Sequence, residues 1–429
     1  MDSNDLVISN AECLDVRSGE IRANTSVRIK DGLIVEISSG RIQAPHLPAI
    51  DAKGRTLMPG LIDCHVHTLG ELEPNLGASP SLVAIFGAQR LHRMLRRGFT
   101  TVRDAGGADA GFRAATAQGV TPGPRMFVSG RALSQTGGHG DMRAQFDVGE
   151  VCGCSRLHRG FGRVADGVPA VLQAARDEIR MGADQIKIVA SGGVGSRSGT
   201  LHTMQFSDEE IQAIVGEAAR WDRYVMAHVY SAEGIKRLVR LGVRTIEHGN
   251  LLDEEGARMI AQSGAYLVPN LIAYESIAKY GKKQGYPAEG LARLAEIFEA
   301  GTRSLEIAQR AGVKIGYGSD LVRDPESQSE EFLIRAKVMK PIDVIRSATL
   351  IGAEIVRQSG KLGVVEVGAV ADLLLVDGNP LEDLTLLTQQ GRHIAYIIKE
   401  GRVEKDSADD DFDARLEKKM FARMKGPLD

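Results

Sequence analysis

The chain lacks the features that mark disulfide-rich, membrane-spanning and nucleic-acid-binding proteins. It has 4 cysteines in 429 residues, too few and too scattered for a disulfide framework. No apolar run approaches the length of a membrane span. The formal net charge is -3, and no basic run carries interleaved aromatic residues. We therefore expect a protein that binds neither membranes nor nucleic acids.

The start of the chain also lacks a secretory signal. Residues 1–10 are polar and acidic, without a basic segment followed by an apolar core. Together with the scarcity of cysteine, this predicts a cytoplasmic protein in a reducing compartment. Cys152 and Cys154 are separated by a single residue, and His158 is nearby. An ordinary loop explains this group better than a second metal site does.

The composition and the segment pattern indicate a large domain and a smaller one, which is built from the segments before and after it. An apolar content of 43% and a charged content of 25% are typical of a globular protein. Residues 1–56 contain short β-rich segments separated by turns, and we expect the first part of a small β-sandwich. Residues 363–404 return to such segments, at 363–368, 371–376 and 396–403, and would complete it. Residues 405–429 form a charged tail.

Residues 57–362 alternate strand and helix patterns. Eight strand-like segments lie at 61–63, 99–103, 125–129, 183–189, 223–228, 244–248, 265–269 and 314–320. Helical patterns between them end in glycine at 98, 182, 242 and 312, and one begins at Ser207 with acidic residues in its first turn. This α/β pattern predicts a (β/α)8 TIM-like barrel. A doubly wound sheet is the alternative, but it usually has fewer units.

Histidines and one aspartate recur where the predicted strands end. His65 and His67 follow the first strand, and side chains two residues apart on a strand share a face. His228 ends the fifth strand, His248 the sixth and Asp320 the eighth. Active sites of such barrels form at the C-terminal ends of the strands. Any one of these residues alone would more often be a satisfied polar group, but their recurrence predicts a metal site.

Lys187 lies in the fourth predicted strand, within an apolar stretch. An ammonium there would be costly unless it were paired. A lysine amine that takes up carbon dioxide becomes a carbamate, whose two oxygens can bridge two divalent cations. Imidazole and carboxylate ligands favour zinc, although manganese, cobalt or iron also suit them. Two cations that share a water would make hydroxide available near neutral pH, with Asp320 accepting its proton.

These residues give the chain a resemblance to the amidohydrolase superfamily. The matching pieces are PGLIDCHVH at 59–67, Lys187, His228, His248, GSD at 318–320 and the sequence at 363–375, which is similar to the superfamily's second domain. The resemblance implies a binuclear centre of two divalent ions, with zinc the first choice. The implied ligands are His65, His67 and Asp320 on one ion, His228 and His248 on the other, and carboxylated Lys187 bridging both.

Within the superfamily the chain resembles the imidazolonepropionase-like group that contains metal-dependent Xaa-Pro and Xaa-Arg/Lys dipeptidases. In such dipeptidases a tyrosine lies two residues past the strand-five histidine, as Tyr230 does here, and a Gly-Gly-His segment follows strand three, as at His139. Tyr230 would donate a hydrogen bond to the scissile carbonyl or to a substrate carboxylate. His139, in a glycine-rich loop, would stabilise an oxyanion. Loop packing is the alternative for each.

A glycine-rich loop at 191–196 follows the fourth predicted strand. It lacks the Gly-Lys-Ser/Thr ending of a phosphate loop. We interpret it as an active-site loop whose backbone amides, including that of Val194, meet the substrate together with Arg197.

These features predict a metal-dependent amide hydrolase that cleaves dipeptides or N-acyl amino acids with a free C-terminal carboxylate. The resemblance favours Xaa-Pro substrates first and Xaa-Arg/Lys second, since the strand-end loops show no clear acidic cluster beyond Asp141 and Glu275. A cyclic amide or imidazolone hydrolase is an alternative, and a non-catalytic metal-binding scaffold barrel is another. We also expect a homo-oligomer.

Overall fold

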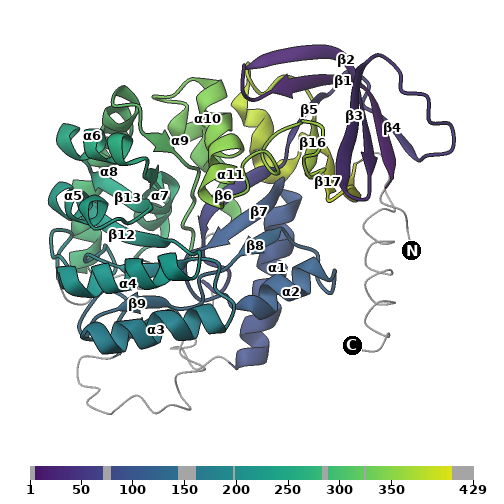
Figure 1. Cartoon of the computed structure of the whole chain (residues 1–429). Helices are drawn as coiled ribbons and strands as arrows, with labels where there is room; N and C mark the ends of the chain where they lie inside the picture. The colour runs from purple at the N-terminus through teal and green to yellow at the C-terminus, as the bar shows by residue number, and fades with distance from the viewer. Residues whose placement is uncertain are drawn as a thin grey trace.

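The computed structural model describes residues 5–70, 79–143, 161–196, 199–282, 288–322 and 325–407. Figure 1 shows a helix-covered region on the left and a strand-rich region at the upper right. Arg197, Cys152, Cys154 and the charged tail from residue 408 onward lie outside the described residues.

Strands from both ends of the chain join in one sheet, which forms the strand-rich region (Figure 1). This 8-stranded sheet has the order β18-β17-β16-β5-β1-β2-β3, with β4 paired to β1. Its strands are β1 (Leu6–Asp15), β2 (Glu20–Lys30), β3 (Leu33–Ser39), β4 (Ala49–Asp51), β5 (Thr56–Pro59), β16 (Leu373–Val376), β17 (Ile394–Lys399) and β18 (Arg402–Asp406). β5 connects the strands from the N-terminal part of the chain to those from the C-terminal part, because it pairs parallel to β1 and antiparallel to β16. Packing of these strands as a two-layer sandwich stays a prediction.

Two parallel sheets form the rest of the core, and they confirm the α/β class. A 3-stranded sheet has the order β6-β7-β8, and a 7-stranded sheet has the order β10-β9-β11-β12-β13-β14-β15. Their strands are β6 (Leu61–Val66), β7 (Phe99–Asp104), β8 (Arg125–Phe127), β9 (Ala132–Ser134), β10 (Gly162–Val164), β11 (Ile186–Val189), β12 (Val225–Ser231), β13 (Thr245–Leu251), β14 (Tyr266–Val268) and β15 (Lys314–Ile315).

Helices follow most of these parallel strands and pack outside them (Figure 1). They are α1 (Pro80–Arg96), α2 (Ala110–Ala117), α3 (Val168–Arg180), α4 (Asp208–Arg220), α5 (Ala232–Arg240), α6 (Glu254–Ser263), α7 (Leu271–Tyr280), α8 (Ala288–Arg310), α9 (Glu331–Arg335), α10 (Pro341–Ser347) and α11 (Leu350–Ile355). Three 3-10 segments accompany them, η3 (Pro325–Glu330), η4 (Leu384–Leu387) and η5 (Gln389–Gly391).

Backbone hydrogen bonds connect the two parallel sheets. The amide of Cys64 in β6 donates to the carbonyl of Tyr317, just past β15, over 2.8 Å. The amide of Asp184, just before β11, donates to the carbonyl of Val128, just past β8, over 2.7 Å. These contacts support the predicted barrel, whose full closure stays a prediction because regular strand pairing stops at both edges.

The helix boundaries predicted from the sequence are confirmed. Ser207 accepts a hydrogen bond from the Glu210 amide, and the Glu210 carboxylate accepts one from the Ser207 amide, which is a complete capping box. The glycines that precede four strands have positive φ angles, which L-residues rarely adopt, at 98, 182, 242 and 312.

Two strand predictions are corrected. Residues 363–368 form a bend and a turn rather than a strand, because Gly363 and Gly368 have φ angles of 71° and 89°, outside the extended region. The eighth barrel strand ends at Ile315 rather than at Asp320. The 3-residue strands β9 and β10 were not predicted, since segments so short carry no clear alternation of apolar and polar residues.

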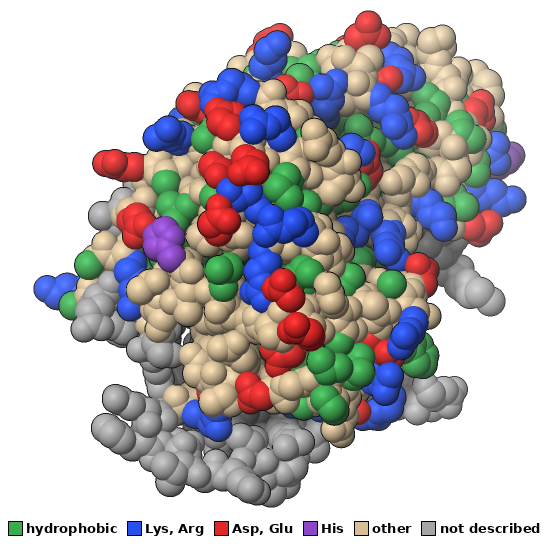
Figure 2. Space-filling model, turned by 60° about the vertical axis from the view of Figure 1, so that its left-hand side comes forward, with side chains coloured by type: hydrophobic (Ala, Val, Ile, Leu, Met, Phe, Trp, Pro, Cys, Tyr) green, Lys and Arg blue, Asp and Glu red, His purple; other side chains and the backbone are tan. Residues whose placement is uncertain are grey.

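The surface carries both signs of charge. On the face drawn in Figure 2, Lys and Arg side chains are interspersed with Asp and Glu side chains and with small apolar patches. No helix among the described residues combines the length and the apolar character needed to cross a membrane.

Gly98 tests how closely the strand-rich sheet packs on the parallel core. A Cβ at residue 98 would lie 2.8 Å from Ile394 Cδ1, whereas a Cβ at Gly312 would meet no atom within 4 Å. Both glycines have positive φ, so Gly312→Ala should cost about 1–2 kcal/mol of stability from backbone strain alone. Gly98→Ala should cost a further ~1–3 kcal/mol from overpacking against β17. The urea denaturation midpoints of the two variants measure this difference in stability. Equal midpoints would show that the structure accommodates a Cβ at residue 98 without cost.

Candidate metal centre

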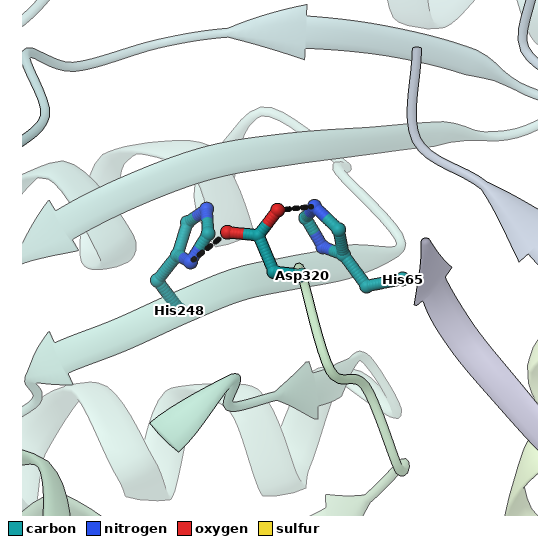
Figure 3. Close-up of side chains that lie close together, drawn as sticks. All are labelled: His65, His248 and Asp320. Carbon is teal, nitrogen blue, oxygen red and sulfur yellow. Dashed lines mark ion pairs between the residues drawn. The ribbon is translucent and has the colours of Figure 1, made fainter. Parts of the chain in front are cut away.

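The predicted metal ligands converge from both parallel sheets. His65 lies in β6, His228 in β12 and His248 in β13. His67 comes directly after β6, and Asp320 follows β15 by five residues. Figure 3 shows the Asp320 carboxylate between the imidazole rings of His65 and His248, with one oxygen turned toward each. The convergence places nitrogen and oxygen ligands around one small volume.

Asp320 is the centre of this group. Its Oδ1 lies 3.0 Å from His67 Nε2 and 3.4 Å from His65 Nε2, and its Oδ2 lies 3.9 Å from His248 Nδ1. One ligand atom from each of His65, His248 and Asp320 lies within 4.8 Å of the others, close enough to share an ion. All three histidines are buried. A buried set of imidazoles around one carboxylate fits a divalent metal ion.

The protonation states also suit a metal. Burial holds the pKa of His228 and of His248 well below the usual value, so both imidazoles are neutral and carry a free lone pair. Although burial opposes it, the attraction and hydrogen bonds of His65 and His67 hold the pKa of Asp320 well below its usual range. His228 Nδ1 lies 2.8 Å from His248 Nε2, so these two rings are neighbours.

Lys187 lies in β11, with 1% of its surface exposed. Its ammonium forms no ion pair with any residue that the structure describes. Burial lowers its pKa to about 8, so more of the amine is neutral near neutral pH than in an exposed lysine. β11 is paired with β12, the strand that carries His228, and the charge of Lys187 contributes to the lowered pKa of His228 and of His248. Neutral amine is the form that takes up carbon dioxide.

Two of these residues have strained backbones. His248 and Asp320 have φ angles of 72° and 51°, in the left-handed region that residues other than glycine rarely adopt. Each such residue costs on the order of 1 kcal/mol and persists only where its surroundings fix it. Other non-glycine residues with positive φ lie elsewhere in the chain, and these two place backbone strain within the cluster itself.

A buried ion pair orients His65. Glu247 Oε2 accepts a hydrogen bond from His65 Nδ1 over 2.7 Å, which leaves Nε2 facing Asp320. Glu247 Oε1 lies 2.8 Å from Arg103 Nη2, and both side chains are fully buried. Despite its burial, Glu247 stays ionised, because the positive charge of Arg103 lowers its pKa. His67 is held similarly, with Nδ1 3.0 Å from the Gly106 carbonyl.

Two further side chains contact the histidines. Asn270 Nδ2 lies 3.2 Å from Nδ1 of both His65 and His248. The Tyr274 hydroxyl lies 3.1 Å from His248 Nδ1 and donates to the Tyr230 hydroxyl over 3.2 Å. Sequence reasoning missed these residues and Glu247. Asn270 follows strand β14 at the end where the other ligands lie, and that position was a usable signal, whereas Tyr274 lies inside α7 and offered none.

The residues predicted to bind substrate lie beside the ligands, except Arg197, which is outside the described residues. The Tyr230 ring stacks on His248 with centroids 5.2 Å apart and planes 11° apart. The His139 ring lies 4.8 Å from that of His228, and burial lowers its pKa to about 4. Val194 is buried in the same apolar cluster as Tyr230. These side chains therefore lie near the candidate ligands, and their contact with a substrate stays a prediction.

The family of the chain follows from its sequence as well as from this site. The chain belongs to the amidohydrolase family, whose model matches residues 56–403. As a member of that family, it is a hydrolytic enzyme that acts on amide C–N bonds. The resemblance inferred from the sequence is confirmed.

Particular relatives cover nearly the whole chain. Ochratoxinase from Aspergillus niger is 32% identical over 407 residues, which span 90% of this chain and 84% of that protein. A solved prolidase complexed with N-methylphosphonate-L-proline is 46% identical with a TM-score of 0.91, and the match covers 94% of this chain and 100% of the prolidase. A Xaa-Pro dipeptidase with bound methionine in its active site is 31% identical with a TM-score of 0.84, over 94% and 100% of the two chains.

The orienting role of Glu247 can be tested by metal affinity. Glu247→Gln should weaken divalent metal binding by about tenfold to a hundredfold, because His65 loses the carboxylate that fixes its ring and tautomer. Competition with a chelating indicator measures the affinity. Glu178→Gln is a matched control, since Glu178 is also a buried carboxylate paired with an arginine, Arg131, but contacts no histidine of the cluster. Equal losses in both variants would mean that the effect is general destabilisation.

Proposed function

We propose that this enzyme is a binuclear metal-dependent dipeptidase that cleaves dipeptides or N-acyl amino acids with a free C-terminal carboxylate, with Xaa-Pro as the preferred class. The observation that carries the proposal is the cluster of the buried His65 and His248 with Asp320, bordered by His67 and His228. A non-catalytic scaffold would not need a base, donors and a glycine-rich loop around the same cluster.

Two divalent ions, with zinc the first choice, complete the proposed site. The proposed ligands are His65, His67 and Asp320 for one ion, His228 and His248 for the other, and carboxylated Lys187 between them. The neutral imidazoles, the ionised aspartate and the lowered pKa of Lys187 support this set. Bound there, such ions supply Lewis acidity and an acidified water near neutral pH.

The chain's own groups would divide the remaining work. Asp320 accepts the proton of the attacking water, since its pKa is far below neutral and it lies at the centre of the ligand set. His139 and Tyr230 donate hydrogen bonds to the scissile carbonyl oxygen or to the substrate carboxylate. The amides of the loop at 191–196, with Arg197, form the remaining substrate contacts.

The preference for proline is supported by relatives and by charge. A prolidase complexed with a proline analogue and a Xaa-Pro dipeptidase are among the similar structures, and ochratoxinase supports amide hydrolysis more generally. An Xaa-Arg/Lys enzyme needs a free carboxylate for the cationic side chain. Asp141 instead pairs with Arg143 at 2.6 Å, and Glu275 with Lys337 at 3.6 Å. Both candidate carboxylates thus already have partners.

The proposed architecture keeps the boundaries expected from the sequence. Residues 57–362 would close as a (β/α)8 barrel, and residues 1–56 and 363–404 would pack as one small sandwich, with a tail at 405–429. The backbone hydrogen bonds at Cys64 and Asp184 support closure of the barrel. A homo-oligomeric, cytoplasmic enzyme remains part of the prediction.

The substrate class is tested by removing one charge. With metal-loaded enzyme, release of proline from Xaa-Pro dipeptides should greatly exceed release of Arg or Lys from Xaa-Arg/Lys. Amidating the C-terminus of the best dipeptide removes the anion and leaves the scissile bond unchanged. The value of kcat/KM should then fall by a factor that corresponds to about 1.5–3 kcal/mol of lost transition-state stabilisation, the usual worth of a hydrogen bond to a charged group. Equal turnover of both forms would favour the cyclic amide or imidazolone hydrolase.

Lys187→Ala tests the bridging carbamate. The variant should lose most bound metal, because no group remains to bridge two ions, and short carboxylates such as acetate or propionate should restore part of it. Elemental analysis of metal per chain is the measurement, with and without added carboxylate. Lys236→Ala serves as a control, because that ammonium pairs with Glu233, Asp253 and Glu255, away from the cluster. Full metal content in Lys187→Ala would remove the lysine from the ligand set.

A further inference from the structure

The hydroxyl of Ser196 connects the glycine-rich loop to His139. Ser196 Oγ accepts a hydrogen bond from the Gly193 amide over 2.7 Å and lies 2.8 Å from His139 Nδ1. The Ser196 amide also donates to the Gly193 carbonyl over 3.0 Å. The loop therefore folds back on itself and presents one hydroxyl to one ring nitrogen.

The direction of the Ser196–His139 hydrogen bond follows from counting protons. A serine hydroxyl has one hydrogen to donate. The Gly193 amide is a donor, so it cannot accept that hydrogen. Among the residues that the structure describes, His139 Nδ1 is the acceptor within hydrogen-bond distance of this hydroxyl. We therefore expect Ser196 to donate to Nδ1, in which case a neutral His139 carries its own proton on Nε2.

Two features fix the geometry of this contact. Arg293, on α8, donates from Nη1 to the carbonyl of Ser196 over 3.1 Å and to that of Gly193 over 3.4 Å. The ring of His139 lies directly against Gly193, where a Cβ would be 2.7 Å from Nε2. The Arg293 guanidinium holds the loop from α8. Because Gly193 has no side chain, the His139 ring can lie against the loop.

We propose that Ser196 is a positioning residue that holds His139 as an Nε2–H donor toward the substrate, with Arg293 fixing the loop from α8. The proposal rests on the proposed function, in which His139 donates to a substrate oxygen. In the other tautomer, Nε2 would present a lone pair to that oxygen and repel it. The hydrogen bond between Ser196 and His139 would therefore decide whether His139 can act as a donor, although Ser196 itself is neither charged nor catalytic.

The tautomer is measured directly by nitrogen NMR of the zinc-loaded enzyme with 15N-labelled histidine. Two-bond correlations distinguish a protonated from an unprotonated ring nitrogen, and a His139→Gln variant identifies the His139 signals. We expect protonated Nε2 and unprotonated Nδ1 in the unmodified enzyme. Ser196→Ala should shift His139 to a mixture or to the Nδ1–H form, and Ser196→Thr, which keeps the hydroxyl, should retain Nε2–H. Ser191→Ala is the matched loop control, because its hydroxyl bonds to the Gly192 carbonyl instead.

Kinetics give an independent readout. Ser196→Ala should lower kcat/KM for a Xaa-Pro dipeptide about two- to tenfold, the usual worth of one hydrogen bond, and Ser196→Thr should restore most of it. An Nδ1–H tautomer in the unmodified enzyme, or an unchanged tautomer in Ser196→Ala, would overturn the proposal. The NMR result does not depend on turnover, so a chain that shows the expected tautomers but hydrolyses no dipeptide would refute the proposed substrate and leave the role of Ser196 standing.

Discussion

The buried pair of Arg103 and Glu247 is the interaction on which the core and the site both depend. Arg103 belongs to β7 in the 3-stranded sheet, and Glu247 belongs to β13 in the 7-stranded sheet, so the pair crosses between the sheets. Arg103 also donates to the Cys64 carbonyl and to Thr245. Leaving either charge alone in this dry interior would cost several kcal/mol, about 3–5 kcal/mol in comparable proteins. The same carboxylate then orients His65, so core packing and ligand geometry cannot vary separately.

Around that pair the site is assembled from groups that are mostly neutral. Burial keeps His139, His228 and His248 neutral, and the carboxylate of Asp320 supplies negative charge among them. Neutral imidazoles are useful in two ways, because a lone pair can hold a metal and an N–H can hold a substrate oxygen. The contact made by one ring nitrogen decides whether the other presents a lone pair or an N–H. Glu247 makes this contact for His65, and Ser196 makes it for His139.

Much of the fold, and the grouping of the candidate ligands at strand ends, could be predicted because their signals are local. Alternation of strands and helices, glycines at helix ends and polar residues at strand ends are all periodic features of the sequence. Glu247 and Tyr274 escaped prediction because their roles depend on partners far along the chain, Arg103 in one case and Tyr230 in the other. The strand expected at 363–368 failed because two glycines adopt left-handed conformations that the apolar pattern conceals.

Strand β5 has a consequence for how the chain folds. It lies between β1, formed from the first residues of the chain, and β16, formed more than three hundred residues later. During synthesis, which proceeds from the N-terminus at about 5–20 residues per second, β5 must wait tens of seconds for its second partner. Until then one edge of β5 is open, and an open apolar edge invites pairing with other chains. The short length of β5, residues Thr56–Pro59, and the proline at its end keep that edge small during the wait.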